Sequence, residues 1–486
     1  MALDDFRNER LKKLARLRDA GIDPYPATTA RTHTLGDAIA QFDALATSHE
    51  PITLAGRVMA QRGHGGLTFL DINDGSGTLQ ALIGADRIGQ EAYEFFLSVV
   101  DIGDIIEVSG TLGTTKRGER SIEASGWAML TKSLLPLPEK WHGLTDTDER
   151  YRKRYLDLIM SDDVRAAFVK RSKLTRALRE FFDGEGFLEV TTPTLQPLYG
   201  GASARPFKTH MNALDIDLFL RIAPELYLKR LVVGGMQSVY EFTTNFRNEG
   251  MDRDHNPEFS ALEFYAAYRD LEWAMSFTER VLAHAVEAVT GSSALSYEGQ
   301  RVEFAGPYRR VTFRELFTEH IGVDFLSATY EDLDAATQRL GVRVEKIVSR
   351  EGLADELFKK VIRKTLIEPT FVTDWPAQLL PLAKRTEQPE LVWAFQFFAA
   401  GFELIKAFGE LNDPIDQRER FSAQEANRAK GDEEAQRMDE DFVEALEYGM
   451  PPTAGWGLGL DRFTMLLTGS HSIRDVILFP TMKPRE

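Results

Sequence analysis

The sequence predicts an α+β protein in which a small five-stranded β-barrel precedes a larger domain built on an antiparallel sheet. Five strand-like runs with alternating apolar residues lie between residues 51 and 140, and glycine-rich turns separate them. Beyond residue 141, several strand-like runs follow one another without long helices between them, a pattern that favours an antiparallel sheet. The 486 residues also exceed the length that one hydrophobic core usually organises, so we expect two or three domains.

The composition excludes several kinds of protein. There is no cysteine, hence no disulfide framework and no thiolate zinc site, and the nine histidines are scattered. Any metal ion should therefore be a hard cation held by oxygen ligands. No window approaches the roughly 18 consecutive apolar residues of a membrane helix, and the N-terminus lacks the apolar centre of a signal peptide. We expect a cytoplasmic protein without a membrane segment.

Charge is distributed unevenly along the chain. The formal net charge of −17 argues against a protein that coats nucleic acid without specificity, because long-range attraction to phosphate is missing. Residues 7–18 nevertheless carry six arginines or lysines and a single glutamate, on a segment with leucines at helical spacing. A solvated helix face is the simpler explanation of this basic stretch.

The five runs of the first domain span residues 53–60, 67–72, 78–83, 105–112 and 121–130. Five short strands suit a small closed barrel, and the OB-fold is the first candidate for that number. Barrels of this type commonly bind single-stranded nucleic acid through aromatic stacking and polar groups that read base edges. On or beside the strands lie Arg62, Phe69, Gln80 and Glu123. Phe69 by itself is more often an ordinary core or surface residue than a stacking platform.

These patterns divide the chain into a basic helix with its lead-in at 1–50, the barrel at 51–140, and the larger domain at 141–486. A stretch rich in proline and charge ends the barrel and marks the boundary near Trp141. The larger domain should begin with a helix at 162–183 and contain strands at 187–192, 218–222, 238–246, 259–268, near 371 and over 391–406. The stretch 271–364 is expected to be mostly helical and carries no chemical signature.

The first chemical motif joins two of these strands. It reads Phe246-Arg247-Asn248-Glu249, and after a short loop His255-Asn256-Pro257-Glu258-Phe259. A strand that emerges into a polar loop and returns as a strand can hold Arg247 rigidly against a phosphate while loop groups close over a nucleotide. Taken as an isolated tripeptide, Arg-Asn-Glu would more simply be surface charge at a hairpin.

The second motif, Gly455-Trp456-Gly457-Leu458-Gly459-Leu460-Asp461-Arg462, opens the last helix. Alternating glycines let the backbone approach a flat ligand closely, and an arginine at the helix start can pair with a terminal phosphate. The spacing differs from the G-x-G-x-x-G fingerprint of dinucleotide-binding folds, and no βαβ unit surrounds it, so we exclude that class.

Together the motifs resemble a known family. The segments 246–259 and 455–462 resemble motifs 2 and 3 of the class II aminoacyl-tRNA synthetases, and 187–193 resembles motif 1. Two further segments, Ala223-Pro224-Glu225-Leu226-Tyr227-Leu228-Lys229 and Glu410-Leu411-Asn412-Asp413-Pro414, resemble the lysyl-tRNA synthetases more than their aspartyl and asparaginyl relatives. The resemblance covers nearly the whole chain and implies a class II catalytic domain after the OB-type barrel.

The resemblance implies roles for individual residues at the ATP site. Arg247 and Arg462 would be catalytic, with Arg247 bridging the lysine carboxylate and the α-phosphate and Arg462 on the γ-phosphate. Phe259 would stack on adenine and His255 would lie beside the phosphates. The ATP-binding set implied in this way is Arg247, Glu249, His255, Asn256, Phe259, Glu403 and Arg462.

The resemblance also implies the other ligands. Gly201 and Glu225 would hold the α-amino group of L-lysine, Arg247 its carboxylate, and Tyr265 with Glu410 its side-chain ammonium. Arg62, Phe69, Gln80 and Glu123 fall where the family reads the anticodon of tRNA(Lys), which now favours base stacking by Phe69. The family further implies Mg²⁺ and a homodimer.

Two positions depart from the family pattern. Glu403 matches one metal-binding glutamate, but Gln396 stands in place of the other, and an amide oxygen contributes no charge. Lys406 stands where asparagine is common, close to the expected lysine and ATP sites. This lysine could take over part of a cation's role or weaken substrate binding.

Two other functions are considered. An aspartate- or asparagine-specific enzyme of the same subgroup would need a different pocket, and for an acidic side chain a cationic one, whereas Glu225 and Glu410 argue for the opposite. A synthetase-like protein that binds RNA or nucleotide for regulation is consistent with Gln396 and Lys406, while Arg247 and Arg462 count against it.

Overall fold

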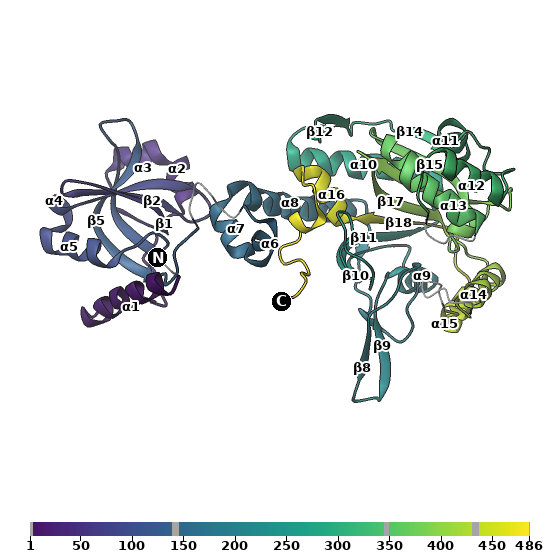
Figure 1. The fold of residues 1–486 in the computed structure, drawn as a ribbon, viewed down its shortest axis with the longest axis horizontal. Coiled ribbons are helices and arrows are strands. Elements are labelled where there is room, and N and C mark those ends of the chain that lie inside the picture. Colours follow the sequence, from purple (N-terminus) through teal and green to yellow (C-terminus); the bar gives the residue numbers. More distant parts are fainter. Residues whose placement is uncertain (1–2, 139–144, 345–348, 430–436, 486) are drawn as a thin grey trace. The chain divides into compact units, whose positions relative to one another are not determined.

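The computed structural model describes residues 3–138, 145–344, 349–429 and 437–485 (Figure 1). The chain forms two compact units, Met1–Met160 and Ser161–Glu486. The predicted domain boundary at Trp141 lies outside the described residues, so the limits 51–140 and 141–486 stay predictions. No helix among the residues described is long and apolar enough to cross a membrane.

The first unit is built on a closed ring of five strands in the order β1-β2-β3-β5-β4, as the sequence predicts. All neighbours are antiparallel except β3 and β5, which are parallel. Alternate residues such as Leu70 and Ile72 point into the barrel and are fully buried. The strands are β1 (Ile52–His64), β2 (Leu67–Asn73), β3 (Thr78–Gly84), β4 (Ile105–Thr114) and β5 (Arg120–Thr131).

The described part of this unit also contains seven helices. Thr34 caps the N-terminus of α2 through its side chain, which accepts a hydrogen bond from the Asp37 amide. The basic stretch near the N-terminus is the helix α1, which packs against α5. The helices are α1 (Leu3–Asp19), α2 (Leu35–Ala40), α3 (Phe42–Ser48), α4 (Ala85–Ile88), α5 (Gln90–Val99), α6 (Thr147–Arg152) and α7 (Arg154–Met160).

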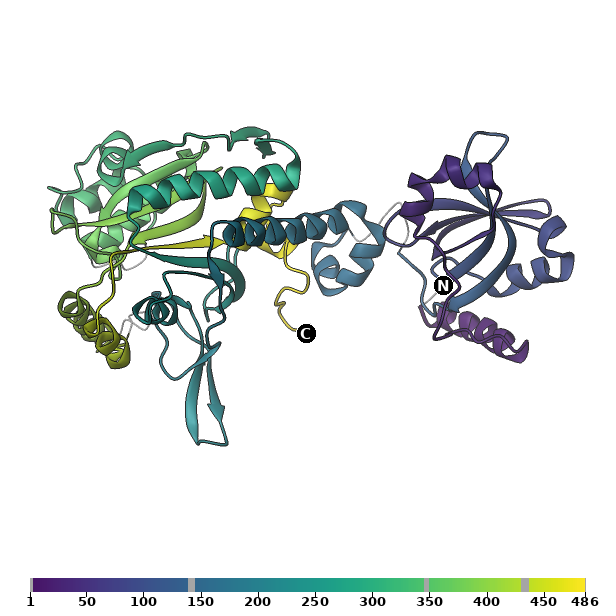
Figure 2. The ribbon, with the colours of Figure 1, turned by 180° about the vertical axis from the view of Figure 1, so that it is seen from behind.

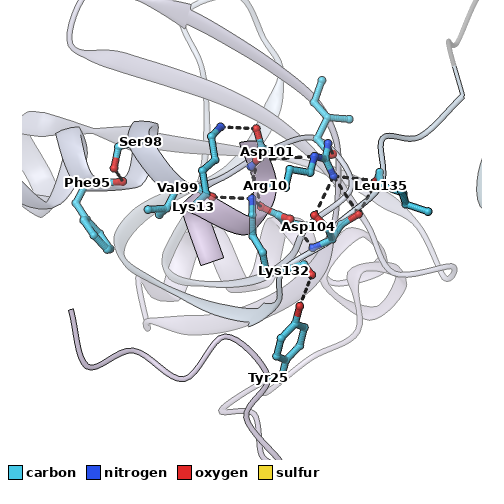
Figure 3. Close-up of polar contacts among 12 residues, drawn as sticks. Arg10, Lys13, Tyr25, Phe95, Ser98, Val99, Asp101, Asp104, Lys132 and Leu135 are labelled. Atoms are coloured by element: carbon cyan, nitrogen blue, oxygen red, sulfur yellow. Dashed lines mark hydrogen bonds and ion pairs between the residues drawn. The ribbon is translucent and has the colours of Figure 1, made fainter. Parts of the chain in front are cut away.

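A buried charge network fastens α1 and the end of β5 to the barrel (Figure 3). The fully buried ammonium of Lys132 donates to Asp101 at 2.6 Å, Asp104 at 2.8 Å and the carbonyl of Val99 at 2.7 Å. Arg10 of α1 donates to the carbonyl oxygen of Ile102 at 2.7 Å and to that of Leu135 at 2.9 Å. Part of the basic stretch therefore holds α1 in place and does not face solvent.

The second unit contains an eight-stranded sheet in the order β14-β15-β16-β17-β18-β11-β10-β6. Its two outermost pairs are parallel and the rest are antiparallel, which confirms the predicted class of sheet. The strands are β6 (Leu188–Glu189), β10 (Ser238–Phe246), β11 (Glu258–Ala267), β14 (Arg309–Thr312), β15 (Thr370–Pro376), β16 (Leu391–Ala399), β17 (Phe402–Gly409) and β18 (Thr453–Gly459).

Three helices cover one face of this sheet, and Figure 2 shows two of them crossing it. They are α8 (Asp162–Gly184), α10 (Leu271–Thr290) and α16 (Leu460–Thr468). The core between helices and sheet is rich in aromatic rings: Phe264 stacks on Trp456 with centroids 5.2 Å apart, and Phe182 packs against both. Helices with one apolar face thus bury this side of the sheet.

The opposite face meets shorter elements. The helix α9 (Glu225–Val233) packs against β10 and β11, and α15 (Glu440–Glu447) packs against both α9 and α14 (Pro414–Ala429). A separate small sheet has the order β7-β9-β8, with β7 (Leu195–Gln196), β8 (Lys208–Met211) and β9 (Ile216–Leu220). The strand predicted at 187–192 is reduced to the two residues of β6.

The stretch 271–364 is predicted to be mostly helical, and its described residues, 271–344 and 349–364, also contain three strands of four residues each. The first two, β12 (Ala294–Tyr297) and β13 (Gln300–Glu303), form a hairpin, and β14 lengthens the main sheet. The helices α11 (Phe313–His320), α12 (Tyr330–Arg339) and α13 (Arg350–Leu357) form a second core around Trp375. Four residues are the shortest run whose alternation indicates a strand, so these strands give only a weak signal in the sequence.

The Lys132 network makes a stability prediction. Lys132→Met removes the counter-ion of buried Asp104 and should lower the free energy of unfolding by about 3–5 kcal/mol, because an uncompensated charge then stays buried. Chemical denaturation followed by circular dichroism measures this effect. Lys12→Met is the matched control, since Lys12 pairs with Glu9 in solvent. Equal unfolding midpoints for the two variants would show that the network does not stabilise the barrel.

Candidate active site

A row of residues at one level crosses five strands on the face of the large sheet opposite α8, α10 and α16. Because residues in register point to the same face, their side chains lie side by side. The middle position has no side chain, since it is a glycine. The row, from β10 through β11, β18 and β17 to β16, is Glu241, Glu263, Gly457, Lys406 and Gln396.

Alternating glycines of β18 form the floor of this site. On the helix-covered face, Trp456 is buried and donates from its indole to Thr278 at 2.9 Å. On the site face, a Cβ at Gly455 would overlap a carboxylate oxygen of Glu410 and lie 2.6 Å from Cε1 of Tyr265. The glycines therefore give room to side chains from neighbouring strands. The sequence predicts this close approach from the alternation of glycine with larger residues.

One end of the floor gathers buried carboxylates. Glu225 begins α9, Glu410 follows β17, and both are buried. Between them lies the fully buried ammonium of Lys229, 2.7 Å from Oε1 of Glu225 and 2.5 Å from Oε2 of Glu410. Gly201 has φ +86° and approaches Glu225 so closely that an added Cβ would lie 3.0 Å from its Cβ. Gly201, Glu225 and Glu410, which are predicted to bind the ammonium groups of lysine, thus lie together.

Burial controls the protonation of this end. It raises the pKa of Glu410 to about 8 although Lys229 opposes the shift, and burial next to Glu225 raises that of Glu263 to about 8. Burial opposes the charged form of Lys229, but Glu225 and Glu410 outweigh it and raise the pKa of Lys229. The pKa of Tyr265 is raised by burial and by the same carboxylates. A cationic ligand here would favour the ionised carboxylates.

The other end of the floor gathers cations. Arg247 follows β10, its amide donates to the carbonyl of Pro257 at 2.8 Å, and its guanidinium lies 5.0 Å from the centre of the Phe259 ring. Arg462 of α16 contacts Nε2 of His255 at 3.0 Å and donates to the carbonyl of Glu403 at 3.2 Å. The predicted phosphate-binding residues of motifs 2 and 3 therefore meet across the strands.

The loop between β10 and β11 supplies the remaining predicted ATP residues. Nδ1 of His255 donates a hydrogen bond to the carboxylate of Asp252 at 2.8 Å, which orients the ring toward Arg462. Asn256 is buried and its amide donates to the carbonyl of Glu258 at 2.6 Å, so it holds the loop in shape. Glu249 is exposed on the loop and opposes the lowering of the Arg247 pKa that burial causes.

Glu403 is a carboxylate among cations. Lys406 lies 3.5 Å from it, and despite burial the pKa of Glu403 is lowered by Lys406, Arg462, Lys359 and Arg363. Glu403, Gln396 and Lys406 line a small cavity of about 100 Å³ together with Lys359 and Arg363. No three side chains of His, Cys, Asp or Glu in the described segments come together to hold a metal ion. Two oxygen ligands suit one Mg²⁺ ion that is bound mainly through a substrate's phosphates.

Several site residues escape sequence reasoning. Lys359 and Arg363 reach the cavity from the stretch without a chemical signature. Glu263 has no role in the motifs read from the sequence. Its signal is that it interrupts the apolar run of β11 at a position paired with Gly457. Lys229 carries a usable signal, because a lysine four residues after Glu225 on a helix lies on the same side of that helix.

The four barrel residues predicted to read bases lie on one outer face. Arg62 pairs with Phe69 across β1 and β2, Phe69 with Leu82 on β3, and Leu82 with Glu123 on β5. Gln80 lies two residues from Leu82 on the same face, where its amide donates to Glu119 at 2.7 Å. Arg62 is held 3.1 Å from Asp71, and Glu123 pairs with Arg87. Their role in base reading stays a prediction.

Fold and site together define a class II tRNA synthetase. The family described as "tRNA synthetases class II (D, K and N)" matches residues 146–483, and "OB-fold nucleic acid binding domain" matches residues 52–130. A lysine–tRNA ligase of Moorella thermoacetica is 50% identical over 100% of this chain and 99% of its own length. One of Roseiflexus castenholzii is 50% identical over 100% of both chains. The chain therefore belongs to the lysine–tRNA ligases.

The glycine floor makes a sharp prediction. Gly455→Ala should reduce amino-acid-dependent ATP–pyrophosphate exchange at least tenfold, because the new methyl group displaces Glu410 and Tyr265. Gly459→Ala is the matched control: its nearest neighbour would be Cδ of Arg462 at 3.8 Å, an ordinary contact, and exchange should stay within threefold. Near-UV circular dichroism verifies that both variants are folded. Equal exchange in the two variants would contradict the proposed floor.

Proposed function

We propose that the protein activates L-lysine with ATP and transfers it to the 3′ end of tRNA(Lys). In the first step a carboxylate oxygen of lysine attacks the α-phosphorus of ATP, which gives lysyl-adenylate and pyrophosphate. In the second step a terminal ribose hydroxyl of the tRNA attacks the activated carbonyl and AMP leaves. The observation that carries this proposal is the pairing of a carboxylate-lined end with an arginine-lined end on one glycine floor.

The charge at the carboxylate end supports lysine as the amino acid. Glu225, Glu263 and Glu410 face Lys229 and Arg247, so full ionisation leaves one negative charge in excess. A cationic side chain neutralises it, whereas aspartate would add a second buried negative charge. Gly201 and Glu225 would take the α-amino group, and Tyr265 with Glu410 the side-chain ammonium. The same charges argue against the aspartate- or asparagine-specific alternative.

The arginine end would bind ATP and stabilise the transition state. Arg247 would contact the lysine carboxylate and the α-phosphate, and Arg462 with His255 the terminal phosphates. Phe259 would stack on adenine, while Glu249 and Asn256 complete the loop around it. No general base is required, because the attacking carboxylate is already ionised at neutral pH. Rate acceleration then comes from positioning and electrostatics.

Magnesium would enter with ATP. Glu403 and Gln396 offer one carboxylate and one amide oxygen, which suits a single ion whose other ligands are phosphate oxygens and water. Bound there, Mg²⁺ would neutralise charge on the triphosphate. Lys406, Lys359 and Arg363 line the same cavity and would supply further positive charge from the protein itself.

The barrel would read the anticodon with Phe69 as a stacking platform and Arg62, Gln80 and Glu123 as polar readers. We further propose a homodimer. Apolar side chains are exposed on Leu188 and Phe479, and Phe479 borders a cavity of about 830 Å³ beside α8, so a second copy has apolar surface to cover. Because tRNA is the proposed substrate, we place the reaction in the cytoplasm.

Exchange of labelled pyrophosphate into ATP with each of the twenty amino acids, at several Mg²⁺ concentrations, tests the activation step. We expect exchange with lysine alone. Arg247→Ala should reduce it at least a hundredfold, because a buried charge-assisted contact to the transition state is lost. Arg301→Ala is the control, since Arg301 pairs with Glu303 in solvent. Absence of exchange with every amino acid would instead favour a regulatory protein that binds RNA or nucleotide.

Charging of tRNA tests the barrel. Phe69→Ala should raise the KM for tRNA about tenfold while lysine-dependent exchange is unchanged, because base stacking is worth about 1–3 kcal/mol per base. Phe69→Trp keeps an aromatic platform and should retain charging. If Phe69→Ala charged tRNA normally, this face of the barrel would not stack on a base.

A further inference from the structure

The buried ammonium of Lys229 contacts both carboxylates that the proposed function assigns to the substrate. It lies on the turn of α9 that follows Glu225, and it reaches Glu410 at the end of β17. No solvent reaches its side chain. Lys229 thus pairs with the two carboxylates that should recognise a lysine substrate. Its role can be inferred from the carboxylate oxygens that it does not contact.

Lys229 occupies one oxygen of each carboxylate. Its ammonium takes Oε1 of Glu225 and Oε2 of Glu410. The other oxygen of Glu410, Oε1, is buried over Gly455, and no hydrogen-bond donor among the residues described reaches it. A buried carboxylate oxygen without a donor is unfavourable unless a ligand supplies one. Oε1 of Glu410 lies beside Tyr265, where a substrate ammonium would donate the missing hydrogen bond.

We propose that Lys229 is a positioning and specificity-determining residue: it bridges Glu225 and Glu410, fixes the two carboxylates at one separation, and keeps both able to bind the two ammonium groups of lysine. This proposal rests on the lysine-binding roles proposed above. The bridge joins α9 to the end of β17, so it sets the spacing between the α-amino and side-chain ends of the pocket. An amino acid with a shorter cationic side chain would fit that spacing less well.

The charges around Lys229 explain why a bridging cation is needed. Glu225, Glu410 and Glu263 would repel one another if ionised in the same buried space. Arg247 offsets part of this charge, Tyr265 is neutral, and Glu241 is satisfied by Arg221. Even with Lys229 present, burial raises the pKa of Glu410 to about 8, so in the empty site this carboxyl takes up a proton near neutral pH.

The pH dependence of lysine binding follows from these charges. Lysine should bind more tightly as the pH rises from 7 to 8.5, because Glu410 loses its proton in this range and can then accept the substrate ammonium. Without Lys229, which opposes the shift, the pKa of Glu410 rises further. The increase in affinity should then move to higher pH, and each unit of displacement lowers the ionised fraction about tenfold at a fixed pH.

The test measures KM for lysine and for ATP by pyrophosphate exchange between pH 6.5 and 9 in the wild type, Lys229→Met and Lys229→Arg. Methionine matches the length of lysine without its charge. We expect Lys229→Met to raise the lysine KM at least tenfold at pH 7.5, to displace the pH profile upward, and to change the ATP KM less than threefold. Lys229→Arg keeps the charge and should keep the pH profile while raising the lysine KM through altered spacing.

Arg230→Met is the matched control, since Arg230 is the next residue of α9 and pairs with Asp439 outside the site. It should leave the lysine KM and its pH profile unchanged. A Lys229→Met enzyme with a higher lysine KM at every pH and no displaced profile would overturn the proposal in favour of a merely structural lysine. Tighter lysine binding in Lys229→Met would also overturn it, because Lys229 would then compete with substrate. Lack of lysine-dependent exchange in the wild type would refute the proposed function instead.

Discussion

The empty face of one central strand is the constraint on which the active site depends. β18 carries glycine at 455, 457 and 459 on one face, and on either side of Gly457 the neighbouring strands β11 and β17 carry Glu263 and Lys406. Only backbone without side chains lets Tyr265 and Glu410 meet above the sheet. The strands supply rigidity, and the glycines supply space for the side chains that line the site.

Charge changes sign along this floor, and the change matches the proposed reactants. Glu225, Glu263 and Glu410 gather at one end, and Arg247 with Arg462 at the other. Lysine carries two ammonium groups and a carboxylate, and ATP carries a polyanionic triphosphate. The ammonium groups would therefore lie at the carboxylate end of the floor, and the lysine carboxylate and the triphosphate at the arginine end. Orientation by fixed charges would bring the lysine carboxylate to the α-phosphate, and the attack itself needs no general base.

Sequence patterns predicted local features such as strands and motifs, and they missed contacts between residues that are far apart in the sequence. The strand 238–246 has the bounds predicted, because alternation over nine residues is a strong signal. The four-residue strands β12 and β13 were too short to recognise, and the run 187–192 keeps only two residues as a strand. Motif order predicted Arg247, Phe259 and Arg462 as neighbours. The pairing of Lys229 with Glu410 depends on tertiary contact between distant segments, which no local pattern contains.

The two faces of β18 make correct folding and activity depend on the same strand register. Trp456 and Leu458 complete the aromatic core on one face, while the glycines between them line the site on the other. A slip of one residue in the pairing of β18 would exchange these faces, so the indole would fill the substrate pocket and the core would lose its largest ring. A misregistered chain is therefore both unstable and inactive. Proteases that remove unstable chains would thereby also remove the copies that hold a blocked pocket.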